Sequence, residues 1–116
     1  MKILRGIAGG MLMMASASAA LAEIDILSVT FTCENGIPLP VTYFNAPDGS
    51  GAAATMVDNS LVPMRQVASG SGIRYESVGG EGTYILRSKG WNASISYLAA
   101  DSAASEQVIY QECSSR

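Results

Sequence analysis

The chain has 116 residues, contains no histidine and carries a formal net charge of −3. The length favours a single domain, and the lack of histidine excludes Ser-His-Asp and Cys-His catalytic triads as well as the usual zinc sites. The negative charge argues against nucleic acid or anionic lipid as the main partner, because binding to either depends on Lys and Arg side chains. We therefore expect no metal ion, no cofactor and no nucleic-acid partner.

Residues 1–22 have the features of a secretory signal peptide. Lys2 and Arg5 form a short basic start, an apolar stretch rich in Met and Ala follows, and the tripeptide that ends at Ala22 supplies the small residues that a signal peptidase requires. A membrane anchor is the alternative, but the apolar run is short and interrupted by glycine. No cysteine directly follows to carry a lipid. The sequence predicts cleavage after Ala22, a periplasmic or secreted location without stable membrane insertion, and a mature domain over residues 23–116.

Cleavage would make the remaining domain more acidic. It would remove Lys2 and Arg5 but none of the ten acidic residues, which leaves five basic residues and a net charge of −5. An acidic surface favours a cationic protein as partner. The same charge is equally common as ordinary solubility charge, so it does not identify a partner.

The two cysteines, Cys33 and Cys113, both lie in the predicted mature domain. An exported protein meets an oxidising compartment, where a single pair of cysteines most simply forms one disulfide. Closed within one chain, such a bond would stabilise the domain by about 4 kcal/mol on the chain-entropy model. The sequence does not exclude a disulfide between two chains.

The mature domain is predicted to consist of short β-strands separated by turn signals. Apolar and polar residues alternate in most segments, as in strands with one buried face, and no segment has a convincing helical pattern. Pro63 interrupts the fourth segment, which suits an edge strand or a bulge. Eight strands at this spacing indicate a closed or nearly closed antiparallel barrel, or a sandwich. The expected strands are 27–33, 39–43, 52–57, 61–67, 73–78, 83–88, 93–97 and 108–113.

The stretch from 69 to 90, SGSGIRYESVGGEGTYILRSKG, is typical of a β-hairpin whose open end carries a serine and a lysine, each beside a glycine. If residues 79–82 form the loop, Gly72 lies opposite Lys89 and Ser71 lies opposite Gly90. Glycine allows another surface to approach the backbone closely, serine offers a small hydroxyl, and lysine presents a compact cation. Ordinary turn composition explains the same residue types without any site.

A Ser-Lys catalytic dyad is the one nucleophilic arrangement that this composition allows. Ser71 would act as nucleophile and Lys89 as base. That chemistry requires a buried lysine with a lowered pKa beside an oxyanion hole, whereas the mouth of a hairpin in a small barrel is expected to be wet. The sequence therefore does not favour an enzyme.

Four sequence elements resemble those of the inhibitors of C-type lysozyme, small bacterial proteins known in membrane-bound and periplasmic forms. The pattern SGIRY at 71–75, the pair KG at 89–90 and the alanine at 93 match the family's SGxxY and KG signature. FTCENG at 31–36 and VTYFN at 41–45 are similar to its aromatic-x-C-x-x-G and V-x-Y-x-N elements, and the late Cys113 also fits. The resemblance covers nearly all of the mature domain.

This resemblance implies an all-β fold, an eight-stranded antiparallel β-barrel stapled by one disulfide. It also implies that the partner is a C-type lysozyme, whose active-site cleft Ser71 and Lys89 enter to meet the two catalytic carboxylic groups. Gly72 and Gly90 would shape the two loops to fit a narrow cleft. Tyr75 would pack at the base of the hairpin and fix the loop.

The chain also departs from the family pattern near the lysine. The family usually has a tryptophan shortly before the lysine, where this chain has Leu86 and Arg87, and an acidic residue where Asn92 stands. Trp91 follows the glycine instead, as either a displaced aromatic contact or a core residue. An envelope or outer-membrane binding module that uses the same barrel is the alternative function, and the sequence is compatible with a homodimer.

Overall fold

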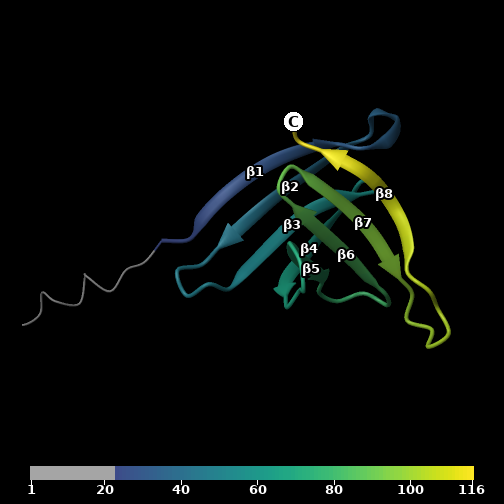
Figure 1. Cartoon of the computed structure of the whole chain (residues 1–116). Helices are drawn as coiled ribbons and strands as arrows, with labels where there is room; N and C mark the ends of the chain where they lie inside the picture. Colours follow the sequence, from purple (N-terminus) through teal and green to yellow (C-terminus); the bar gives the residue numbers. More distant parts are fainter. Residues whose placement is uncertain (1–22) are drawn as a thin grey trace, which may run out of the picture.

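The computed structural model describes residues 23–116, and the predicted signal peptide lies outside the described residues. Eight antiparallel strands form a closed barrel in the order of the sequence, with each strand beside the next (Figure 1). The predicted all-β barrel is therefore confirmed, and each expected strand is present. The strands are β1 (Asp25–Thr32), β2 (Pro38–Asn45), β3 (Gly51–Val57), β4 (Ser60–Val67), β5 (Ile73–Ser77), β6 (Thr83–Lys89), β7 (Asn92–Leu98) and β8 (Gln107–Ser114).

The one helical element among the described residues is a single 3-10 turn, η2 (Glu34–Gly36), between β1 and β2. Asn35 and Gly36 both have positive φ angles, 65° and 74°, which are conformations that Asn and Gly tolerate best. The amide of Cys33 donates to the carbonyl of Ile37 at 2.7 Å, so the turn brings the chain directly back along β1. Within Glu23–Arg116, no helix is long and apolar enough to cross a membrane.

The barrel interior is filled by side chains that alternate along each strand. In β2, for example, Leu39, Val41 and Tyr43 are buried while the residues between them are less buried or exposed. This two-residue period is the pattern from which the strands were predicted. One apolar cluster results, and it includes Phe31, Leu39, Val41, Tyr43, Ala53, Val57, Val62, Met64, Tyr75, Leu86, Ala93 and Ile95.

Closure between the first and last strands is narrow. β1 pairs with β2 along its whole length, but it pairs with β8 only at Thr32 and Ser114. The disulfide between Cys33 and Cys113 follows directly after this pair and confirms a bond within one chain. Because the two strands overlap only at their carboxyl ends, most of β1 has no strand on its second side, as its long free stretch in Figure 1 shows.

Neither the edge strand nor the bulge expected at Pro63 is present, since the β3–β4 pairing runs through Pro63 without a register shift. β4 pairs with both β3 and β5, so it is not an edge. However, the β5 ladder begins at Met64, and at Pro63 the strand is paired only with Ala54 of β3. On the other side, the amide of Val78 donates to the Pro63 carbonyl at 3.1 Å. A proline is tolerated here because the ladder does not require its missing N–H.

Candidate functional site

The structure brings Ser71 and Lys89 together at the open end of the β5–β6 hairpin. Ile73 pairs with Ser88 and Tyr75 with Leu86, which is the register expected from a loop at residues 79–82. The Lys89 ammonium donates a hydrogen bond to the Ser71 hydroxyl, with 2.9 Å between Nζ and Oγ. Both residues are exposed. The hairpin thus presents a cation and a hydroxyl side by side to solvent.

Gly72 allows Ser71 to lie against Lys89, because a residue with a side chain would not fit at this position. Its φ is +68°, and a Cβ atom at this position would lie 2.7 Å from the Ser88 carbonyl oxygen and 3.1 Å from the Lys89 Cβ. Both the backbone conformation and the close approach to β6 therefore require glycine. Ser69 adds a second restraint, since its hydroxyl donates to the Ser71 carbonyl at 2.8 Å.

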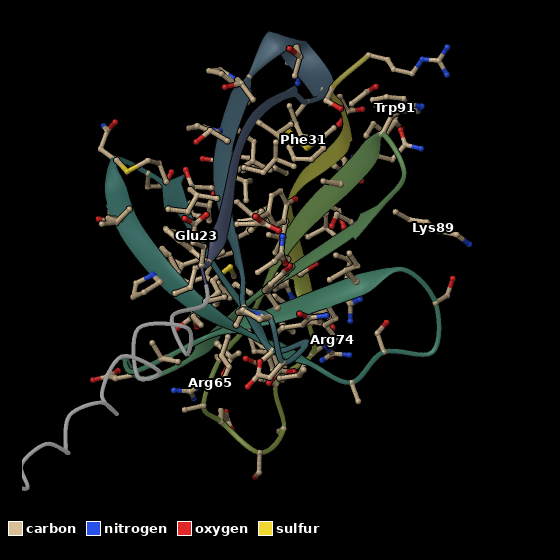
Figure 2. The ribbon with its side chains drawn as sticks, turned by 90° about the vertical axis from the view of Figure 1, so that its left-hand side faces the viewer. Glu23, Phe31, Arg65, Arg74, Lys89 and Trp91 are labelled. Atoms are coloured by element: carbon tan, nitrogen blue, oxygen red, sulfur yellow. A yellow bond between two sulfur atoms is a disulfide. The ribbon has the colours of Figure 1, made fainter. Side chains whose placement is uncertain are left out.

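Gly90 and Trp91 form the two-residue turn that joins β6 to β7, since Lys89 is paired with Asn92. Gly90 has a φ of +60°, as expected for glycine at the first central position of a tight hairpin turn. The Ser115 amide donates to the Trp91 carbonyl at 2.9 Å, which ties the turn to the end of β8. The Arg116 guanidinium lies 5.5 Å from the indole centroid. In Figure 2, Trp91 and Lys89 project from the same edge of the barrel.

Two buried tyrosines form the floor beneath these loops. Tyr75 is buried in the core, in keeping with the packing role expected of it, and its ring lies 5.6 Å from that of Tyr43. Burial raises the pKa of Tyr43, an effect that its hydrogen bond with Ser88 partly offsets, and burial also raises the pKa of Tyr75. Both phenols are therefore neutral at physiological pH and add no negative charge beside Lys89.

The other cations of this hairpin are already engaged. Arg74 forms an ion pair with Glu76 at 2.9 Å, and Arg87 forms one with Glu106, which precedes β8. Among the described residues, Lys89 makes no ion pair, and its ammonium donates a side-chain hydrogen bond only to the neutral Ser71 hydroxyl. Its charge is thus free to meet a carboxylate of a partner.

This geometry suits recognition of carboxyl groups better than nucleophilic catalysis. An ammonium forms a charge-assisted hydrogen bond with a carboxylate, and a hydroxyl can bond to a protonated or an ionised carboxyl group. A Ser-Lys dyad needs a buried lysine, whereas both Ser71 and Lys89 face solvent. Within Glu23–Arg116, no cluster of Cys, Asp or Glu side chains has the arrangement of a metal site.

Comparison with known proteins agrees with the sequence signature. The family model described as membrane-bound lysozyme-inhibitor of c-type lysozyme matches residues 31–104, which is more than half of the chain. The chain belongs to this family. A relative from Pseudomonas aeruginosa, the membrane-bound lysozyme inhibitor of C-type lysozyme, is 38% identical over 74 residues. That match takes in 64% of this chain and 55% of the relative, so the chain spans about half the length of the relative.

Two solved structures of lysozyme inhibitors are similar to this barrel. One is PliC-St, the periplasmic lysozyme inhibitor of C-type lysozyme from Salmonella typhimurium, with a TM-score of 0.66 and 27% identity over 79% of this chain and 99% of that chain. The other is Pseudomonas aeruginosa MliC in complex with hen egg white lysozyme, with a TM-score of 0.52 and 25% identity over 90% of this chain and 100% of that chain. This is a family of proteins that inhibit an enzyme, which agrees with the expectation that the chain is not one itself.

The residues that the lysozyme-inhibitor signature singled out occupy one end of the barrel, but they differ in accessibility. Ser71, Gly72, Lys89 and Gly90 lie on the surface, whereas Tyr75 is buried. Trp91 is exposed, so of the two interpretations left open by the sequence, the core residue is wrong. A tight turn directly after Gly90 is the sequence signal that could have indicated this exposure.

Proposed function

We propose that this protein inhibits a C-type lysozyme by inserting the Ser71 and Lys89 loops into the enzyme's active-site cleft. The observation that carries the proposal is the exposed pair itself, with the Lys89 ammonium 2.9 Å from the Ser71 hydroxyl and free of any carboxylate in the described part of its own chain. Membership of the lysozyme-inhibitor family supports it.

The proposed mechanism follows from how lysozyme divides its catalysis between two carboxyl groups. One is a protonated general acid and the other is an ionised carboxylate that faces the sugar. Lys89 would pair with the ionised group, and Ser71 would hydrogen-bond the acid. Both groups would then be engaged, and the loops would occupy the space that the substrate needs. Gly72 supports this role because it lets the serine loop approach β6 closely.

The acidic surface is expected to help the encounter. The predicted mature domain carries a net charge of −5, and a cationic enzyme would be drawn to it over distances of about one Debye length. A periplasmic or secreted location is part of the same proposal, since the relatives are described as membrane-bound and periplasmic proteins.

The test is lysis of a peptidoglycan-cell suspension by hen egg white lysozyme, with and without the oxidised protein. We expect stoichiometric suppression by the wild type, and a loss of affinity of about 100-fold for Lys89→Ala. Ser71→Ala is expected to lose about tenfold, because one neutral hydrogen bond is removed. Arg65→Ala, which removes an exposed cation on β4, is the matched control and should inhibit as the wild type does.

Two outcomes would count against this proposal. A folded wild-type protein that leaves lysis unchanged would show that the chain does not inhibit this enzyme, and would favour a binding module of the cell envelope instead. Unchanged inhibition by a folded Lys89→Ala variant would show that inhibition does not depend on the lysine, and the insertion mechanism would be wrong.

A further inference from the structure

An apolar groove of about 430 Å³ lies directly beside Lys89. It exists because β1 and β8 overlap at a single residue pair, which leaves the side of β1 before Thr32 without a neighbouring strand. Leu27 and Val29 of β1 form one bank, and Gly72, Ile73 and the turn from Lys89 to Trp91 form the other. In Figure 2, Phe31 lies inside the barrel, whereas Lys89 projects outward from it.

The groove has an apolar floor and an unusually exposed apolar rim. Phe31, Tyr43 and Tyr75 are almost fully buried beneath it. At the rim, Leu27, Ile73 and Trp91 leave 56%, 43% and 57% of their surface to solvent. Burying each of these side chains against a partner would contribute favourable free energy in proportion to the apolar area that is covered. Exposed apolar residues that lie next to one another mark binding surfaces more often than exposed apolar residues that are scattered singly.

The rim is also held in place before any partner arrives. The Trp91 backbone is fixed by its turn and by the hydrogen bond from Ser115, and Arg116 lies over its ring. Leu27 belongs to a strand that is paired with β2 through Tyr43. A side chain that is already positioned loses little conformational entropy on binding, and tryptophan is the residue type that most often dominates interface energetics.

We infer that this groove receives an apolar side chain of the same lysozyme whose carboxylates meet Ser71 and Lys89. The inference rests on the proposed function. It follows from continuity, because Gly72, Lys89 and Gly90 line the groove and also form the proposed inserting loops. It also follows from chemistry, because the general acid of a C-type lysozyme lies in an apolar pocket against a tryptophan, so that apolar surface borders the carboxyl groups. Trp91 then acts as the aromatic anchor of the interface.

The affinity of the exported, oxidised protein for hen egg white lysozyme tests this inference. We expect Leu27→Ser and Trp91→Ser each to weaken binding by about tenfold, mainly through faster dissociation. The loss should be equal at low and high salt, because apolar contacts are not screened. Leu61→Ser is the matched control, since Leu61 is 68% exposed on β4 and does not line the groove; it should change affinity less than about twofold.

The possible failures of the two proposals can be told apart. If the wild type does not bind lysozyme, the proposed function fails and the inference fails with it. If the wild type binds and both groove variants bind within twofold of it, the proposed function stands and the groove inference is overturned. The groove could instead join two copies of this chain. In that case Leu27→Ser and Trp91→Ser would change the protein from dimer to monomer in analytical ultracentrifugation and leave the affinity for lysozyme unchanged. That result would also overturn the groove inference.

Discussion

At the residue scale, the candidate site depends on how closely two backbones approach. Ser71 and Lys89 are 18 residues apart in sequence, and they meet because Gly72 lets its loop pass against Ser88. Gly72 and Gly90 both have positive φ, but only Gly72 is crowded, since nothing lies within 4 Å of a Cβ at Gly90. A side chain at Gly90 would therefore meet backbone strain alone, whereas a side chain at Gly72 would meet both backbone strain and a steric clash.

We predict that Gly72→Ala destabilises the barrel more than Gly90→Ala does. An alanine at Gly90 carries only the cost of positive φ, about 1 kcal/mol, whereas an alanine at Gly72 adds a clash with the Ser88 carbonyl, for a total of about 2–3 kcal/mol. Urea unfolding gives both free energies. Gly72→Ala should also weaken lysozyme binding, because Ser71 moves away from Lys89. Equal destabilisation by the two substitutions would contradict this account.

At the element scale, two ion pairs offset the facing cations of the β5–β6 hairpin, and one of them connects the hairpin to the segment before β8. Arg74 and Arg87 are directly opposite each other on β5 and β6, a placement that would be unfavourable without neighbouring carboxylates. Glu76 pairs with Arg74 and Glu106 with Arg87. The hydrogen bond from Arg87 is the main reason that the pKa of Glu106 is lowered, and the same bond raises the pKa of Arg87.

This pair gives a pH-dependent contribution to stability whose sign follows from the lowered pKa. Glu106 is ionised in the folded protein to a lower pH than in the unfolded chain, so its contribution is fully present above about pH 4.5 and is lost as the pH falls through its folded pKa. Because the pair is partly exposed, we expect Glu106→Gln to cost less than about 1 kcal/mol at pH 7 and to cost less at pH 3 than at pH 7.

Urea unfolding of Glu106→Gln and the wild type at pH 7 and pH 3 measures this difference. Glu81→Gln is the control, because Glu81 lies in the exposed hairpin loop and forms no ion pair among the described residues. A stability difference between Glu106→Gln and the wild type that persists undiminished at pH 3 would show that the side chain acts through packing rather than charge.

The elements that were predictable from sequence are those set by local rules. The strands follow from the two-residue alternation, and the register of the β5–β6 hairpin follows from the position of its glycine loop. The groove beside Lys89 was not predictable, because it depends on how far β8 slides along β1 when the barrel closes. That offset is the sum of the register shifts between all neighbouring strands around the barrel, so the sequence of one segment does not determine it. The exposure of Leu27 and Ile73 is missed for the same reason.

At the scale of the whole molecule, the disulfide compensates for the limited pairing between β1 and β8. One residue pair, Thr32 with Ser114, joins the two strands, and the Cys33–Cys113 bond lies next to it. The bond links residues 80 apart in sequence, so it restricts most of the unfolded chain. It also fixes the end of β8, whose following residue, Ser115, holds the Trp91 turn.

We predict that the double variant Cys33→Ala/Cys113→Ala loses about 4 kcal/mol of the free energy of unfolding. Small domains have only about 5–15 kcal/mol in total, so the variant should fold but be marginal. Hydrogen exchange should accelerate most in β1, which is paired on its second side only at Thr32, and least in β3, which is paired on both sides. Reduction of the wild type is the matched comparison, because it opens the same bond while keeping both buried sulfur atoms. If the reduced wild type is as destabilised as the double variant, chain entropy accounts for the effect; if it keeps nearly full stability, the side-chain packing of the two cysteines matters more than the covalent link. Uniform acceleration of exchange over all eight strands would contradict local opening at the β1–β8 contact.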